Sequence, residues 1–231
     1  MTIPYDAIRA FRSRHVFNPW AQRDPLDAAA SRTCETGPRG RLARIRAHFD
    51  VSPALVLVGE ASGYQGCHFS GIPFTNEKLL LDGRIPRVPA LGRLSKRARP
   101  WCEPSATIVW GALHALGLAE RTVLWNAFAW HPFKPGQPYS NRVPTRGELE
   151  AGLNVLDRVL GTFGGATVVA VGKVAERALR ELRRDADVTV RHPAMGGADE
   201  FRSGLAAVAA HLDRTTGRKG EHAGRSGPER R

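Results

Sequence analysis

The sequence predicts an α/β fold, a three-layer α/β/α sandwich with a central four-stranded parallel sheet. Two observations lead to it. Four short apolar runs have the character of buried parallel strands. Each run is followed by a polar or glycine-rich segment and then by residues with helical periodicity. Helical crossovers of this kind give a parallel sheet covered on both faces.

The chain of 231 residues shows no internal repeat and no second domain. We expect one domain over residues 1–213. Residues 214–231 are rich in Gly, Arg and Ser and lack an apolar face, so they are predicted to be a disordered basic tail.

The N-terminal part predicts two helices before the first strand. Residues 3–14 carry apolar side chains at helical spacing. Residues 15–27 contain two X-Pro steps and predict an irregular segment strapped onto the fold. Pro38 is placed to open a basic helix that ends near His48. The first strand, residues 54–58, then stops at Gly59.

A glycine-rich stretch, Gly59–Glu77 (GEASGYQGCHFSGIPFTNE), follows that strand. We call it the glycine loop. Its glycines let backbone amides approach a ligand closely. In an open parallel sheet, ligands bind at the carboxyl ends of the strands. The stretch is therefore a candidate site, although a plain connecting loop or a phosphate-binding turn would have a similar composition.

Residues 79–100 predict a long surface loop, because they combine prolines, glycines and basic residues without periodicity. Its basic side chains either line a phosphate-binding face or are merely solvated. They are Arg84, Arg87, Arg93, Lys96, Arg97 and Arg99.

The remaining elements alternate strand and helix. Pro104 is suited to the first turn of a helix that carries an apolar face over 106–116. The second strand, 123–125, ends at Asn126, and a long loop, 127–144, follows it.

A capping box, Thr145 to Glu148, begins a helix that reaches about Leu160. The remaining predicted elements are strand 166–171, helix 172–184, strand 188–190 and helix 198–212.

The composition is basic and shows no membrane signal. The 34 Lys and Arg residues exceed the 22 Asp and Glu residues, so the net charge is +12. A basic body suits a polyanion such as nucleic acid, although an arginine-rich proteome from a GC-rich genome would give the same balance. No run of about 18 apolar residues is present, so no membrane span is expected. The N-terminus shows no secretory signal.

The cysteines Cys34, Cys67 and Cys102 are widely spaced and form no CxxC pair. This argues against a disulfide framework and against a four-thiolate metal or cluster site. We therefore expect a cytoplasmic protein without a metal or another cofactor. Cys67 lies in the glycine loop and is interpreted as a small buried filler.

Three predicted strands end in functional side chains: Glu60 after the first, Asn126 after the second and His192 after the fourth. Parallel strands bring these ends to one rim of the sheet. The Asn amide offers a donor and an acceptor side by side, which matches the O4 and N3–H edge of uracil or the N6/N7 edge of adenine. Phe74 could stack on a base, and His192 could stabilise negative charge on it.

These motifs together resemble the uracil-DNA glycosylase superfamily over roughly residues 50–205. Gly59-Glu-Ala-Ser-Gly63 with Gly71-Ile-Pro-Phe74 resembles the first motif of the family 4 type. Asn126 and the segment 140–144 (SNRVP) resemble its next motifs. Val171-Gly-Lys and His192-Pro-Ala resemble those after the third and fourth strands.

The resemblance implies roles for the base-binding and catalytic residues. Phe74 would stack on the flipped base, Asn126 would read its Watson–Crick edge, and His192 would stabilise the departing uracil anion. Glu60 would position or activate the water, with Gln65 as a second candidate. The pocket would also be lined by Gly59, Ala61 and Tyr64.

The resemblance also implies DNA contacts. Met195, flanked by two glycines, would enter the duplex and fill the gap left by the base. Arg142 and Arg191 would hold phosphates, together with Ser140.

The sequence departs from known uracil glycosylases in several ways. Ala61 stands where the best-known members carry a water-activating Asp, and Gly63 stands where they carry a Tyr that blocks thymine. The four cluster cysteines of family 4 are missing, so no iron–sulfur cluster is expected.

The function that the resemblance implies is hydrolysis of the N-glycosidic bond of uracil in DNA after base flipping, leaving an abasic site, without a metal. We expect a monomer whose partners are uracil-containing DNA and the abasic product. Two alternatives are a glycosylase for another deaminated base, hypoxanthine or xanthine, and a non-catalytic DNA-binding protein. A phosphate-gripping nucleotide enzyme is less favoured, because the glycine loop has no Lys before Lys78.

Overall fold

The computed structural model describes residues 2–32, 34–89 and 92–223, with side chains up to residue 214. Its central sheet has four parallel strands in the order β3-β2-β5-β6. They are β2 (Leu55–Ala61), β3 (Thr122–Phe128), β5 (Thr167–Val171) and β6 (Val188–Val190). The predicted α/β fold with a four-stranded parallel sheet is confirmed.

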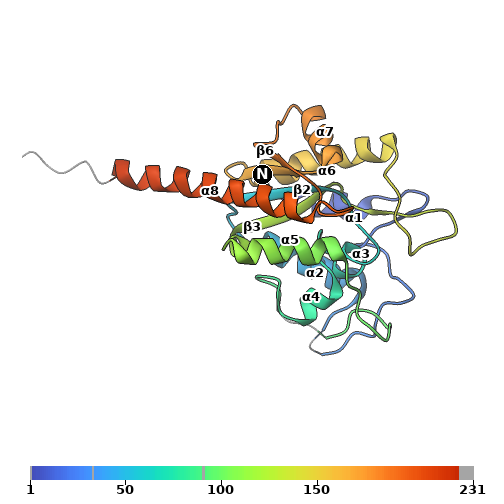
Figure 1. Ribbon diagram of the computed structural model, residues 1–231. Helices are drawn as coiled ribbons and strands as arrows, with labels where there is room; N and C mark the ends of the chain where they lie inside the picture. The colour runs from blue at the N-terminus through green and yellow to red at the C-terminus, as the bar shows by residue number, and fades with distance from the viewer. Residues whose placement is uncertain (1, 33, 90–91, 224–231) are drawn as a thin grey trace, which may run out of the picture.

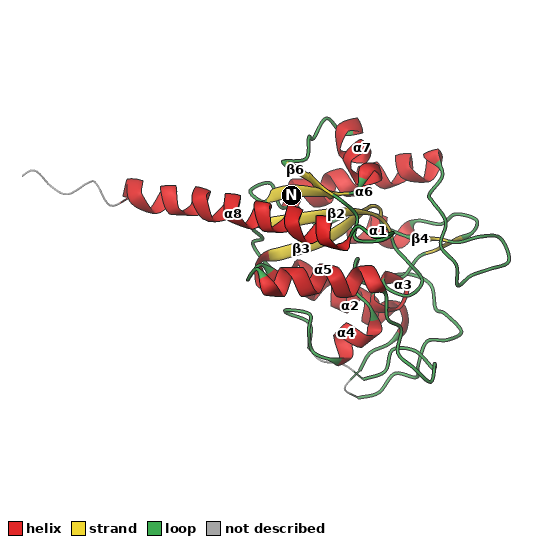
Figure 2. Ribbon diagram, in the orientation of Figure 1, coloured by secondary structure: helices red, strands yellow, loops and turns green. Residues whose placement is uncertain are grey.

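Helices cover both faces of this sheet (Figures 1 and 2). α6 (Arg146–Thr162) contacts β3, and α7 (Lys173–Glu181) contacts β2, β3 and β5. α5 (Pro104–Ala115) lies just below β3 in the view of Figure 1. α8 (Ala198–Ala223) contacts both β6 and α5. The capping box expected at Thr145 and Glu148 is present at the start of α6.

The first two strands are longer than the sequence predicts. β2 continues through Gly59 and Glu60 to Ala61, and β3 continues past Asn126 to Phe128. The two strands pair in register, with Gly59 opposite Asn126. This pairing extends the ladder into residues whose own composition is typical of a loop, and it fixes Asn126 beside Gly59.

The N-terminal segment forms an unpredicted sheet with the loop after β3. After α1 (Tyr5–Ala10), β1 (Val16–Phe17) pairs antiparallel with β4 (His131–Pro132). The expected strapping onto the fold is therefore a short two-stranded sheet. No local sequence pattern predicts that β1 and β4 pair, because they are more than 100 residues apart in the chain.

α2 (Gly37–Phe49) holds the segment that leads to Phe74. Arg41 is fully buried and forms an ion pair with Asp27 at 2.6 Å. Arg44 donates from Nε to the backbone oxygen of Ser70 at 2.6 Å. Trp20 Nε1 donates to the oxygen of Gly71 at 3.0 Å. Buried charges persist only when paired and hydrogen-bonded. Arg41 meets this need with Asp27, whereas Arg44 and Trp20 hold the end of α3 (Cys67–Ser70).

The long loop before α5 is organised around a buried carboxylate. Glu77, at the start of α4 (Glu77–Leu81), accepts hydrogen bonds from the backbone N–H groups of Leu94, Ser95 and Trp101. It also accepts from the Ser95 hydroxyl and pairs with Arg93. The loop is therefore partly buried, with Leu94 in the core. A short 3-10 helix, η1 (Ala119–Arg121), leads into β3.

The helix α8 continues through residues 214–223, which the sequence assigns to the basic tail. Extending a helix that already exists avoids the cost of nucleation. Phe201 and Leu205 are buried in the core and supply that nucleus. Residues 224–231 of the predicted tail lie outside the described residues. No helix in the described part of the chain is long and apolar enough to cross a lipid bilayer.

Candidate active site

Phe74 and Asn126 meet over Gly59 at the carboxyl ends of β2 and β3. A Cβ placed on Gly59 would lie 2.4 Å from Cζ of Phe74 and 2.7 Å from the terminal amide of Asn126. Cβ atoms do not approach other heavy atoms so closely, so only glycine fits here. The structure thus brings together three of the residues expected to bind a base.

Phe74 is held in an uncommon backbone conformation. Its φ is +50°, a region that a bulky residue rarely adopts. Gly71 also has a positive φ, +79°, and packs against the backbone of Arg41. Backbone strain of this kind persists only where the surrounding contacts enforce it, and it is common at functional sites. The ring of Phe74 is 8% exposed, so it presents a limited surface at the rim.

Asn126 is 2% exposed and keeps free hydrogen-bonding capacity. With its amide oriented to satisfy its neighbours, it donates to the oxygen of Trp125 (3.1 Å) and accepts from the N–H of Ser62 (3.2 Å). A carboxamide has two N–H donors and two acceptor lone pairs. One donor and one acceptor therefore remain for a ligand.

His192 follows β6 and lies near Phe74, with ring centroids 6.1 Å apart. Its Nδ1 accepts a hydrogen bond from the N–H of Ala194 at 3.1 Å. The neutral ring therefore carries its proton on Nε2. Burial, followed by the nearby Arg191 charge, lowers the pKa of His192 and favours this neutral form. Gly172, with φ +88°, leaves room for the His192 side chain.

Hydrogen bonds to residues from other segments hold the turn after β2 in place. Ser62 donates from its hydroxyl to the oxygen of Ala129. Asn141 accepts from the N–H of Tyr64 at 3.1 Å. The Tyr64 ring packs edge-on against Trp101, with centroids 5.4 Å apart, rather than against Phe74. Gln65 lies partly exposed in the same turn.

Glu60 and Gly59 alternate along β2, so their side-chain directions point to opposite faces of the strand. Because the Gly59 direction faces Phe74 and Asn126, Glu60 points away from them. Burial raises the pKa of Glu60. Ala61 returns to the Gly59 side but offers only a methyl group.

The residues expected to contact DNA divide into two groups. All three guanidinium nitrogens of Arg142 donate hydrogen bonds within the protein. Both terminal nitrogens donate to the Glu148 carboxylate at 2.7 Å, and the other bonds go to backbone oxygens. The Ser140 hydroxyl donates to Gln137 and accepts from Lys134. Both side chains therefore stabilise the loop after β4, because their hydrogen-bond donors are already paired within the protein.

Arg191 and Met195 are on the surface beside His192. Arg191 is more than half exposed and pairs with Glu200 at 2.9 Å, an exposed ion pair that costs little to exchange. Met195 is 93% exposed and has a positive φ of +54°. An apolar side chain displayed in this way suits a wedge.

Three residues of the site were not selected from the sequence. Ser62 and Asn141 position the turn after β2, and Glu103 lies against Gly63 and Gly66. Asn141 falls within the SNRVP motif, so a signal for it existed. Ser62 and Glu103 carry no local signal, because their contacts come from tertiary packing.

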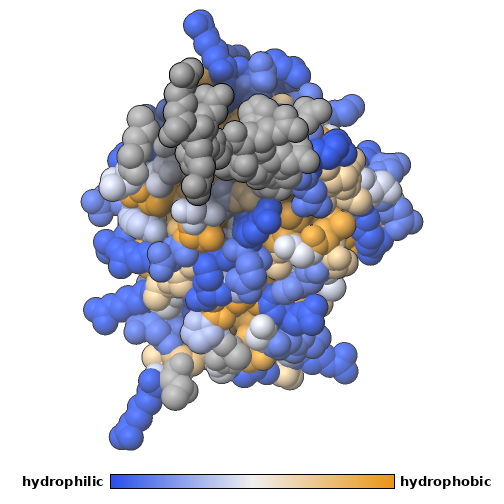
Figure 3. Space-filling model, turned by 90° about the vertical axis from the view of Figure 1, so that its left-hand side faces the viewer, coloured by the Kyte–Doolittle hydropathy of each residue, from blue (hydrophilic) through white to orange (hydrophobic). Residues whose placement is uncertain are grey.

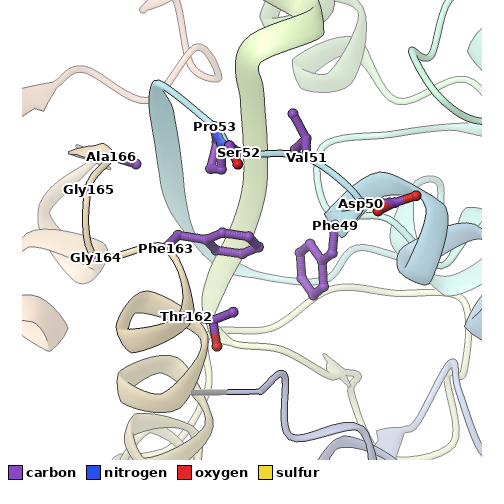
Figure 4. Close-up of a pocket in the computed structure, with 10 residues that line it drawn as sticks. All are labelled: Phe49, Asp50, Val51, Ser52, Pro53, Thr162, Phe163, Gly164, Gly165 and Ala166. Atoms are coloured by element: carbon purple, nitrogen blue, oxygen red, sulfur yellow. The ribbon is translucent and has the colours of Figure 1, made fainter.

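One hollow lies at the opposite end of the sheet, where the strands begin. It measures about 680 Å³ and is lined by 49–53 and 162–166, which precede β2 and β5 (Figure 4). Ligands of open parallel sheets bind at the carboxyl ends of the strands, so this hollow is not the site. No group of three or more His, Cys, Asp or Glu residues among the described residues could hold a metal ion.

A model of the uracil-DNA glycosylase superfamily matches residues 47–212. The chain belongs to this superfamily. The match spans β2 to α8 and so includes Phe74, Asn126 and His192. DNA is the substrate that superfamily membership implies. The match concerns the superfamily as a whole, so the likeness to family 4 rests on the motifs alone.

No curated protein matches the chain. Among solved structures, the chain is similar to wild-type SMUG2 of Pedobacter heparinus. The two share 19% identity with a TM-score of 0.49, over 68% of this chain and 76% of that chain.

Proposed function

We propose that this superfamily member hydrolyses the N-glycosidic bond of uracil in DNA after flipping the nucleotide out of the duplex. The observation that carries the proposal is that the Phe74 ring and the Asn126 amide both approach Gly59 on the side where a side chain would project. It supports a slot with an aromatic face and one free amide donor and acceptor. That combination fits the O4 and N3–H edge of a stacked uracil.

His192 supports the chemical step. As the C1′–N1 bond breaks, the bonding pair leaves with uracil, and negative charge develops on the base oxygens. The Nε2–H of His192 would donate to the O2 side of the base and stabilise that charge. Water adds to C1′ and leaves an abasic site. Glu60 and Gln65, at the end of β2 and in the turn after it, are the groups proposed from the sequence to hold this water.

Met195 and Arg191 would act on the duplex. The Met195 side chain would enter the space left by the flipped base, since an apolar wedge compensates for lost stacking. Arg191 would exchange Glu200 for a phosphate, because an exposed ion pair contributes little to stability. We further propose that the protein acts as a monomer in the cytoplasm.

A second candidate substrate is another deaminated base, such as hypoxanthine or xanthine. It is favoured by Ala61 and Gly63, which stand where the best-known uracil glycosylases carry a water-activating Asp and a Tyr that blocks thymine.

One experiment separates these possibilities. The protein is incubated with labelled oligonucleotides that contain uracil, hypoxanthine or xanthine, single- and double-stranded, and abasic sites are then cleaved with alkali. We expect strand breaks at uracil. Breaks at hypoxanthine or xanthine alone would promote the second candidate, and tight binding without breaks would indicate a non-catalytic binding protein.

A further inference from the structure

Glu103 places a carboxyl group against the glycine loop. It is the residue before α5, but its side chain does not cap that helix. A Cβ placed on Gly63 would lie 3.1 Å from Oε1 of Glu103, and one on Gly66 would lie 2.1 Å from Oε2. The absence of side chains at Gly63 and Gly66 therefore makes room for this carboxyl.

The position of Glu103 is fixed through its backbone. Its carbonyl oxygen accepts from Nδ2 of Asn76 at 3.1 Å and from the hydroxyl of Thr107 at 3.3 Å. Asn76 is itself fully buried at the start of α4. The Glu103 backbone is therefore held in place, and its carboxyl group points toward the glycine loop.

The carboxyl of Glu103 is available to a ligand. It is partly exposed, and it makes no hydrogen bond or ion pair within the described part of the chain. Burial raises the pKa of Glu103 to about 7. By contrast, the buried carboxylate of Glu77 accepts five hydrogen bonds and has a lowered pKa. Glu103 thus can exchange a proton near neutral pH.

The other acidic group in this region is less well placed. Ala61 supplies no functional group where well-known uracil glycosylases have a carboxylate. Glu60 points away from Phe74 and Asn126 because side chains alternate along β2. Glu103, reaching in from α5, approaches the turn that follows Ala61.

We propose that Glu103 is the catalytic base that takes the proton from the attacking water. The inference rests on the proposed glycosylase function. One O–H bond of the water breaks, and its proton passes to the Glu103 carboxylate. The water oxygen bonds to C1′ while the C1′–N1 pair leaves with the base. The protonated carboxyl then returns its proton to solvent.

The test is single-turnover excision of uracil from DNA, measured from pH 5 to 9 for the wild-type protein and four variants. The variants are Glu103→Gln, Glu103→Asp, Glu60→Gln and Glu181→Gln, the last an exposed control on α7. Glu103→Gln removes no hydrogen bond within the described residues, so its thermal unfolding is expected to match the wild type. General-base catalysis contributes about 10²–10⁴-fold.

We expect Glu103→Gln to lower the rate by on the order of 10²-fold and to remove a rise in rate centred near pH 7. Glu103→Asp keeps an ionisable group and should retain that rise at an intermediate rate. The Glu181→Gln rate should equal the wild-type rate. The inference would be overturned if Glu103→Gln kept the full rate and an unchanged pH profile. It would also be overturned if only Glu60→Gln lost the pH-dependent rise. Both outcomes would leave the proposed uracil excision intact. An inactive wild-type protein would overturn both proposals.

Discussion

Gly59 is the residue that couples the two halves of the proposed base pocket. Phe74 comes from the glycine loop and Asn126 from β3, and both contact the Gly59 backbone from the direction in which a side chain would project. Their relative position therefore depends on the missing side chain.

Replacing Gly59 with Ala should disturb the pocket more than the fold. The new methyl group would overlap Phe74 or Asn126, so one of them must move. Misplacement by about 1 Å can cost about 10²-fold in rate, and we expect a loss of that order in single-turnover excision. Gly111→Ala is the matched control, since a Cβ there meets nothing within 4 Å. Equal excision by the two variants would show that the contact is not needed.

Met195 offers a test of the wedge. Its side chain is 93% exposed, so Met195→Ala should leave the melting temperature unchanged. We expect excision from duplex DNA to fall by about tenfold, with no change on single strands, because only a duplex has a gap to fill. Val143→Ala, at another large exposed apolar residue, serves as the control. An equal loss on both substrates would assign Met195 some role other than insertion.

At the scale of elements, the loop between α4 and α5 depends on Glu77. This carboxylate accepts bonds from three backbone N–H groups, one hydroxyl and one guanidinium. Its pKa is lowered, with burial opposed by the hydrogen bonds of Ser95, Trp101 and Arg93. The loop in turn leads to Glu103, so its order matters to the site.

Glu77→Gln should destabilise the fold by about 2–4 kcal/mol, since an amide leaves at least one buried donor unpaired. The free energy of unfolding can be measured by urea titration. A carboxyl whose folded pKa is lowered stabilises the fold above its unfolded pKa, and this contribution is lost as pH falls through the folded value. The wild-type advantage should therefore shrink below about pH 4.5. An advantage that stays constant down to pH 3 would contradict this account.

The sequence predicts the sheet and its main helices because burial imposes simple periodicities on both. It does not predict the ends of β2 and β3, where Gly59 pairs with Asn126 and Ala61 pairs with Phe128. It also misses the pairing of β1 with β4, which joins distant segments.

The candidate site likewise has residues that the sequence predicts and residues that depend on tertiary contacts. The motifs locate Phe74, Asn126 and His192, and the structure brings them to one rim. Arg142 is different, because its guanidinium is engaged by Glu148, a contact that residue type alone does not reveal. Glu103 is missed for the same reason, since its neighbours come from the glycine loop.

For the whole molecule, the net charge of +12 should govern DNA affinity. Figure 3 shows hydrophilic residues over most of one face, with separate smaller apolar areas. Binding to a duplex should weaken steeply as salt rises, because each neutralised phosphate releases counterions.

Lys96→Ala with Arg99→Ala removes two exposed charges from the loop before α5. If that loop follows the DNA backbone, the salt dependence of the dissociation constant should fall by about one to two units of slope. Arg177→Ala with Arg180→Ala removes the same charge from α7 and should change the slope less. Equal slopes for the two double variants would show that the loop charges are only solvated.

The most direct test of the central claim is uracil excision by Asn126→Asp beside the wild-type protein, scored as alkali-labile breaks in one labelled oligonucleotide. An aspartate accepts but does not donate, so it cannot serve the O4 of uracil, whereas it suits the amino group of cytosine. We expect the wild type to cut at uracil, and the variant to lose most of that cutting and to gain breaks at cytosine. Uracil excision that is unchanged in Asn126→Asp would contradict the account.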